Sequence, residues 1–155
     1  MTDHDTSERV VAHSDFMLER RLDASAAAVF AAWADEPAKR SWFAADAESY
    51  RLDFTVGGSE TVDTTLADGH RVRFHATYHD ILASERIVFS ALLSSDDRPA
   101  TVSLTTVEFV PDGRGTRLVL TEQGAFLDGL ERPEWRERGT GTWLDALVRH
   151  VEGSA

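Results

Sequence analysis

LERRLDASAAAVFAAWADEPAKRSWF, the stretch from Leu18 to Phe43, decides the fold. At its start, Phe16, Leu18 and Leu22 share one parity, and most residues between them are charged or polar. This alternation is typical of a strand with one buried face, and only Arg20 interrupts its apolar side. We therefore expect the first strand from Phe16 to Leu22.

Two short helices are predicted directly after this strand. Ser25 offers an N-cap hydroxyl to the run of helix formers over 26–34. Asp35 repeats the cap, and Pro37 suits the first turn of a second helix that carries Trp42.

From Glu48 to Gln123 the chain alternates with period two and is interrupted by turn signals, which is typical of an antiparallel meander. Gly57-Gly58 and Asp68-Gly69 supply the positive φ angles of tight hairpins. A parity switch between Leu104 and Val107 predicts a bulge or bend. The expected strands cover 50–56, 60–66, 72–78, 86–93, 101–110 and 116–122.

The C-terminal part reads as a longer helix after a connection over 124–134. Asp145 and Arg149 fall opposite an apolar arc that we expect to be buried, with Trp143, Leu144 and Leu147 at its centre. The arc comprises Thr140, Trp143, Leu144, Leu147, Val148 and Val151. The element order predicts an α+β fold in which a curved seven-stranded antiparallel sheet wraps on this helix. The gap between sheet and helix is where a small apolar ligand would bind.

Composition limits the classes of function. The chain has 155 residues, a formal net charge of −11 and no cysteine. The charge argues against nucleic acid and anionic membranes as partners, and the lack of cysteine excludes disulfides and thiolate chemistry. We recognise no signal peptide or membrane span and expect a cytoplasmic protein with one domain over 15–152, preceded by a polar, disordered arm over 1–14.

The opening stretch and four later motifs together resemble a known family. These motifs are LDFTVGGS at 52–59, ERIVFS at 85–90, TRLVLTEQG at 116–124 and GTWLDAL at 141–147. They resemble the bacterial family related to the C-terminal domain of the activator of the ninety-kilodalton heat-shock protein ATPase, over about 15–151. The resemblance implies the START-like (SRPBCC) helix-grip fold, which carriers, enzymes and cochaperones share.

The common motifs for metal, nucleotide or nucleophilic chemistry are not recognised. His75 and His79 are four residues apart on a predicted strand, or about 13 Å, too far to share one metal ion. No nucleophile elbow, dinucleotide fingerprint or P-loop is present. We expect no metal site and no cofactor.

Arg20 and Glu122 are the two charged residues on apolar strand faces. The helix-grip fold places the first and last strands side by side, so we expect the two side chains to form an ion pair at the polar end of the pocket. The alternative is that one or both lie at a strand end and reach solvent. The candidate ligand-binding residues are Arg20, Phe74, Tyr78, Leu120, Glu122, Trp143 and Leu147.

Three functions fit this sequence. The first is non-catalytic binding of a small apolar or aromatic molecule between the sheet and the C-terminal helix. The second is a cochaperone-like module that regulates an ATPase through a protein partner such as a chaperone. The third is an aromatase/cyclase- or hydrolase-like enzyme that uses a pocket acid such as Glu122.

Overall fold

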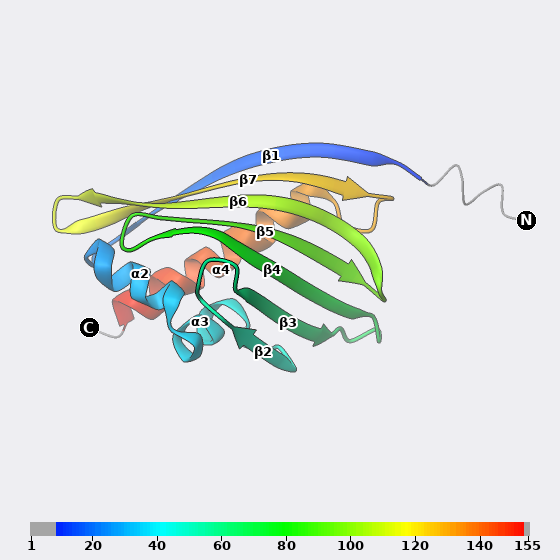
Figure 1. The fold of residues 1–155 in the computed structure, drawn as a ribbon, viewed down its shortest axis with the longest axis horizontal. Coiled ribbons are helices and arrows are strands. Elements are labelled where there is room, and N and C mark those ends of the chain that lie inside the picture. Colours follow the sequence, from blue (N-terminus) through cyan, green and yellow to red (C-terminus); the bar gives the residue numbers. More distant parts are fainter. Residues whose placement is uncertain (1–8, 154–155) are drawn as a thin grey trace, which may run out of the picture.

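Residues 9–153, which the computed structural model describes, form one curved antiparallel sheet and three helices (Figure 1). The strands are β1 (Val11–Leu22), β2 (Ser49–Leu52), β3 (Ser59–Thr65), β4 (Arg71–Leu82), β5 (Arg86–Ser95), β6 (Arg98–Asp112) and β7 (Gly115–Leu127). Their order in the sheet is β1-β7-β6-β5-β4-β3-β2, with every neighbouring pair antiparallel. The predicted α+β class and the adjacency of first and last strands are confirmed.

The helices α2 (Ala26–Ala34), α3 (Glu36–Phe43) and α4 (Pro133–Gly153) lie on the same side of the sheet (Figure 1). The predicted caps are present. The Ser25 hydroxyl accepts a hydrogen bond from the Ala28 N–H, and the Asp35 carboxylate accepts one from the Ala38 N–H. Each cap satisfies a backbone donor that the first helical turn leaves free, which fixes where the helix begins.

Several boundaries differ from the predicted ones. β1 begins at Val11, which pairs with Leu127, so residues 11–14 of the predicted disordered arm are part of the sheet; residues 1–8 of that arm lie outside the described residues. Long-range pairing with β7 supplies order that the polar sequence of the arm did not indicate. β2 ends at Leu52, and α4 begins at Pro133.

The bulge predicted in β6 is wrong. The register with β5 and β7 is continuous from Thr101 to Val107, and the buried positions keep one parity throughout. Val102 and Leu104, the apolar residues that suggested a parity switch, face solvent instead. The inner face of this part of β6 consequently carries hydroxyl groups, from Thr101, Ser103 and Thr105.

The core lies between the sheet and the helices. Leu144 and Leu147 of α4 are fully buried and Trp143 is half-buried, as predicted, while Asp145 and Arg149 face outward. Trp33 packs edge-on against both Trp42 and Trp143, with ring centroids 4.9 and 5.9 Å away. These contacts join α4 to α2 and α3, and Trp143 also lines the pocket beside the N-terminal half of α4.

Candidate functional site

A pocket of about 260 Å³ lies between the N-terminal half of α4 and the inner face of the sheet. Its wall is largely apolar and is formed by Phe43, Val62, Phe74, Phe89, Leu93, Trp135 and Trp143. The remaining lining residues are Thr105, Glu122, Glu131, Arg136, Gly139 and Thr140. An apolar wall with a few convergent polar groups is the usual composition of a small-molecule site.

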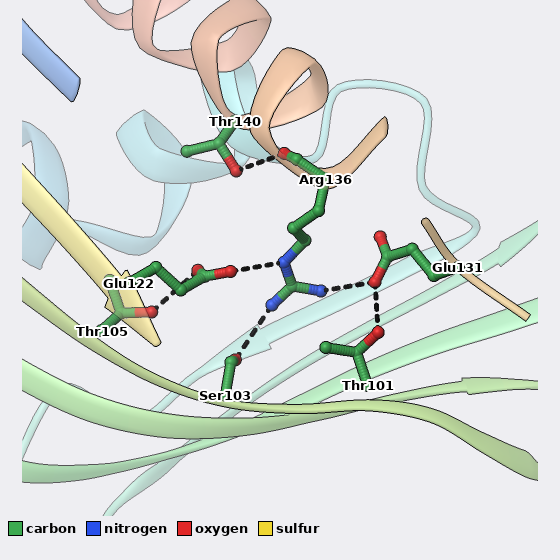
Figure 2. Close-up of polar contacts among 7 residues, drawn as sticks. All are labelled: Thr101, Ser103, Thr105, Glu122, Glu131, Arg136 and Thr140. Carbon is green, nitrogen blue, oxygen red and sulfur yellow. Dashed lines mark hydrogen bonds and ion pairs between the residues drawn. The ribbon is translucent and has the colours of Figure 1, made fainter. Parts of the chain in front are cut away.

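Arg136 of α4 organises the polar end of the pocket, as Figure 2 shows. Its Nε donates to Glu122 Oε2 at 2.7 Å, its Nη1 to Glu131 Oε1 at 3.2 Å and its Nη2 to Ser103 Oγ at 3.0 Å. The Arg136 and Glu122 side chains are only 10% and 6% exposed. This ion pair joins the first turns of α4 to β7.

Hydroxyl groups from β6 also donate to both acids. Thr105 donates to Glu122 Oε1 at 2.9 Å, and Thr101 donates to Glu131 Oε1 (Figure 2). Buried carboxylates are tolerated when such donors replace the water they lose. The buried hydroxyl groups of β6 therefore lie next to the Arg136 guanidinium and the two acids that it binds.

Gly139 keeps one side of the pocket open. It lies one helical turn after Trp135 and one turn before Trp143, and a Cβ placed on it would meet no atom within 4 Å. Trp135 is 50% exposed, whereas Trp143 is anchored inside against Phe43, with ring centroids 5.1 Å apart. The gap at Gly139 thus lies between an outer and an inner tryptophan.

A second polar cluster is buried behind the pocket wall. Lys39 Nζ lies 2.9 Å from Glu60, and the hydroxyls of Tyr50 and Tyr78 both donate to the same carboxylate. Lys39 and Glu60 are 1% and 0% exposed. The Lys39 ammonium also lies 4.7 Å from the ring centroid of Phe43, whose ring lines the pocket.

Burial changes the ionisation of this cluster. Desolvation lowers the pKa of Lys39, against the opposing effect of Glu60. Desolvation, followed by the charge and the hydrogen bond of Glu60, raises the pKa values of Tyr50 and Tyr78 well above the ordinary tyrosine value. The two tyrosines therefore stay protonated and donate to Glu60.

The structure brings three of the seven predicted site residues together. Phe74, Glu122 and Trp143 line the pocket. The other predicted residues lie elsewhere: Leu120 and Leu147 are fully buried in the core, Tyr78 belongs to the Lys39 cluster, and Arg20 is outside the lining. The part that any of the seven takes in binding a ligand stays a prediction.

The predicted ion pair between Arg20 and Glu122 is wrong. In the β1–β7 register Arg20 is opposite Leu118, whereas Glu122 is opposite Phe16, so the two charges are four residues apart along the strands, about 13 Å. Arg20 Nε instead donates to Asp145 of α4 at 2.7 Å. Glu122 also pairs with a residue of α4, since its carboxylate binds the Arg136 guanidinium.

The sequence reading missed Arg136, Lys39 and Glu60. The signals were present, because Arg136 precedes Thr140 by four residues and Trp143 by seven, on the buried arc of the predicted helix. Glu60 likewise shares the parity of Val62 on its strand. Arg136 and Glu60 share this signal, a charged residue on an apolar face, with Arg20 and Glu122.

The described residues offer no obvious metal centre. Within 9–153, no three His, Asp or Glu side chains are grouped so that they could hold a metal ion. His75 and His79 are exposed and hydrogen bond to Thr61 and Ser90. None of the helices in the same range combines the length and apolar composition that crossing a membrane requires.

Comparison with known proteins adds a family and close structural relatives. The family model described as Activator of Hsp90 ATPase homolog 1-like protein matches residues 23–152. A crystal structure of a protein from Rhizobium loti is 42% identical, with a TM-score of 0.86, and the match covers 91% of this chain and 99% of that one. An uncharacterized protein from Rhizobium leguminosarum is 38% identical, with a TM-score of 0.90 and coverage of 93% and 97%.

A more distant structure, from Chromobacterium violaceum, is 26% identical, with a TM-score of 0.74 and coverage of 89% of this chain and 97% of that one. No functionally curated protein is significantly similar in sequence to this chain. The comparisons therefore give the family and the fold, and the chemistry of the site has to come from its residues.

Proposed function

This chain belongs to the Activator of Hsp90 ATPase homolog 1-like family, and from that premise we propose that it binds a small apolar or aromatic molecule, without converting it, in the pocket beside α4. The observation that supports this function is the aromatic pocket itself, which ends in a fixed set of polar groups. Protein interiors are otherwise close-packed, with few voids larger than a water molecule.

The pocket volume suits a ligand of one or two fused rings. A cavity of roughly 150 Å³ with an apolar lining accommodates benzene, and this pocket holds about 260 Å³. Burial of such a ligand against Phe74 and Trp143 removes apolar surface from water, which favours binding by roughly 25 cal/mol for each Å². Glu122 and Arg136, held by their own hydrogen bonds, then orient a polar substituent.

Filling the gap at Gly139 tests this function. Naphthylmethanol is a suitable probe, since it combines two fused rings with one hydroxyl. We expect titration calorimetry to show binding to the unmodified chain and amide NMR shifts to cluster at the pocket residues. Gly139→Leu should abolish binding, because the new side chain enters the open space between Trp135 and Trp143.

The matched control is Thr142→Leu, which adds the same side chain at an exposed position of α4 that does not line the pocket. It should bind the probe like the unmodified chain. If the unmodified chain does not bind naphthylmethanol, or if Gly139→Leu binds it equally well, the proposed function is wrong.

A second candidate, regulation of an ATPase through a protein partner, is favoured by the family description and by an exposed apolar patch. Leu92 and Val102 are directly opposite each other on β5 and β6, with Leu104 two residues along, and all three face solvent on the outer side of the sheet. A stimulated ATPase rate of an Hsp90-type chaperone that is lost in Val102→Lys would support it. If the unmodified chain does not change the ATPase rate of the chaperone, this second function is contradicted.

An enzyme that uses Glu122 as an acid has less support. Both oxygens of this carboxylate already accept hydrogen bonds, from Thr105 and Arg136. We therefore do not propose it.

A further inference from the structure

We infer that the ligand of this pocket carries a positively charged group, such as a primary amine or amidine, on its aromatic body. The inference rests on the proposed function and specifies its ligand class. It follows from the polar end of the pocket, where the carboxylates of Glu122 and Glu131 face a single guanidinium, that of Arg136.

Arg136 is poorly placed to receive an anionic ligand. Each of its three nitrogen atoms already donates to a protein acceptor, namely Glu122, Glu131 and Ser103 (Figure 2). These bonds use three of the five N–H groups of the guanidinium. A ligand carboxylate or phosphate that approached the other two would face the negative charges of Glu122 and Glu131 in a largely dehydrated site, where charges interact strongly.

Glu131 can accept further hydrogen bonds. Its Oε1 receives both Arg136 Nη1 and the Thr101 hydroxyl, whereas no hydrogen bond from residues 9–153 reaches its Oε2. Figure 2 shows the second oxygen of this carboxylate turned away from the guanidinium. The side chain is 17% exposed, so it lies where the pocket meets solvent. An ammonium group could donate there without breaking an existing contact.

The pocket wall is compatible with a cation. The rings of Phe74, Phe89 and Trp143 present aromatic surface, and the negative face of such a ring attracts a positive charge placed over it.

Two protein cations also approach the lining rings. Lys39 is compensated by Glu60 at 2.9 Å, and the Arg132 guanidinium lies 5.1 Å from the centroid of the half-exposed Trp135 ring. Because Lys39 is paired and Arg132 is exposed, the lining retains an excess of one negative charge.

Three probes with the same ring system separate charge from shape. They are naphthylmethylamine, naphthylmethanol and naphthoate, which are positive, neutral and negative at neutral pH. We expect the amine to bind the unmodified chain most tightly and the acid most weakly, with dissociation constants that differ by about tenfold or more between them. Titration calorimetry at fixed ionic strength measures all three.

Glu131→Gln provides the matched variant, since it removes the charge and keeps the shape and the acceptor of the side chain. It should weaken binding of the amine several-fold and affect binding of the alcohol much less. The control is Glu134→Gln, which makes the same charge change at an exposed position near the start of α4 outside the lining. It should change neither.

The outcomes distinguish this inference from the proposed function. If the acid binds as tightly as the amine, or the amine no more tightly than the alcohol, the inference is wrong and the binding function stands. The inference is also wrong if Glu134→Gln weakens amine binding as much as Glu131→Gln does. If none of the three probes binds the unmodified chain, the proposed function itself fails.

Discussion

Arg136 and Glu122 form an ion pair with 2.7 Å between Nε and Oε2, and this contact fastens the beginning of α4 to β7. Both side chains are at least nine-tenths buried. The pair thus joins two elements whose separation sets the width of the pocket. A buried ion pair of this kind changes the free energy of unfolding little when both partners are present, but removing one partner leaves an uncompensated buried charge and is strongly destabilising.

Arg136→Met should lower the free energy of unfolding by about 3–5 kcal/mol, because it leaves Glu122 buried without its cation. Combining it with Glu122→Met should cost less than the sum of the two single changes, and urea denaturation of the four proteins measures that coupling. For comparison, Arg20→Met should cost less than about 1 kcal/mol, because Arg20 and Asp145 are partly exposed. If Arg136→Met and Arg20→Met lower the free energy of unfolding by equal amounts, this prediction is contradicted.

Alkaline pH should destabilise the fold through Tyr50 and Tyr78, the two tyrosines of the chain. Their pKa values are raised in the folded state, so above about pH 10 the unfolded chain releases protons that the folded chain retains. The free energy of unfolding should then fall by up to about 1.4 kcal/mol per pH unit for each tyrosine. The lowered pKa of Lys39 acts in the opposite direction, but only up to its ordinary value of 10.5.

Tyrosinate absorbance measures this directly. We expect no tyrosinate signal in the folded protein and a signal that rises together with loss of the folded circular dichroism spectrum. In Tyr50→Phe the pH dependence should become shallower. A tyrosine that titrates near pH 10 in the folded protein would disprove the prediction.

Gly139→Ala should raise the free energy of unfolding by about 0.5–1 kcal/mol. The position lies inside α4, its new Cβ meets no neighbouring atom, and alanine favours a helix over glycine by roughly that amount. Gly141→Ala is the matched comparison and should gain less, since its Cβ would lie 3.3 Å from Arg20 Nη2. Thermal and urea unfolding of the two variants tests the order, which would be refuted if Gly141→Ala were the more stable.

Leu147→Ala should destabilise the fold by roughly 2–5 kcal/mol, because Leu147 is fully buried and its removal leaves a cavity in the core. Leu104→Ala, at an exposed position on the outer face of β6, should change stability by less than about 0.5 kcal/mol. Since Leu147 does not line the pocket, binding of naphthylmethanol should survive in any Leu147→Ala protein that remains folded. Loss of binding with unchanged stability would place Leu147 in the site after all.

The sequence by itself determined the element order, the helix caps and the buried face of the C-terminal helix. Ser25 and Asp35 cap the predicted helices, and Leu144 and Leu147 lie on the predicted buried arc. These features depend on neighbours within one or two turns, where helical and strand periodicity fix which side chains share a face. Such local signals do not choose between the ways in which the elements can be arranged in space, and the family resemblance supplied that arrangement.

Only the tertiary structure decided which charges meet. Parity placed Arg20 and Glu122 on inner faces, but the β1–β7 register puts them about four residues apart, and α4 supplies Asp145 to one and Arg136 to the other. Periodicity specifies the face on which a side chain lies and gives no information about its position along a neighbouring strand. That position follows from register and from the packing of α4, which are set by contacts between residues far apart in the chain.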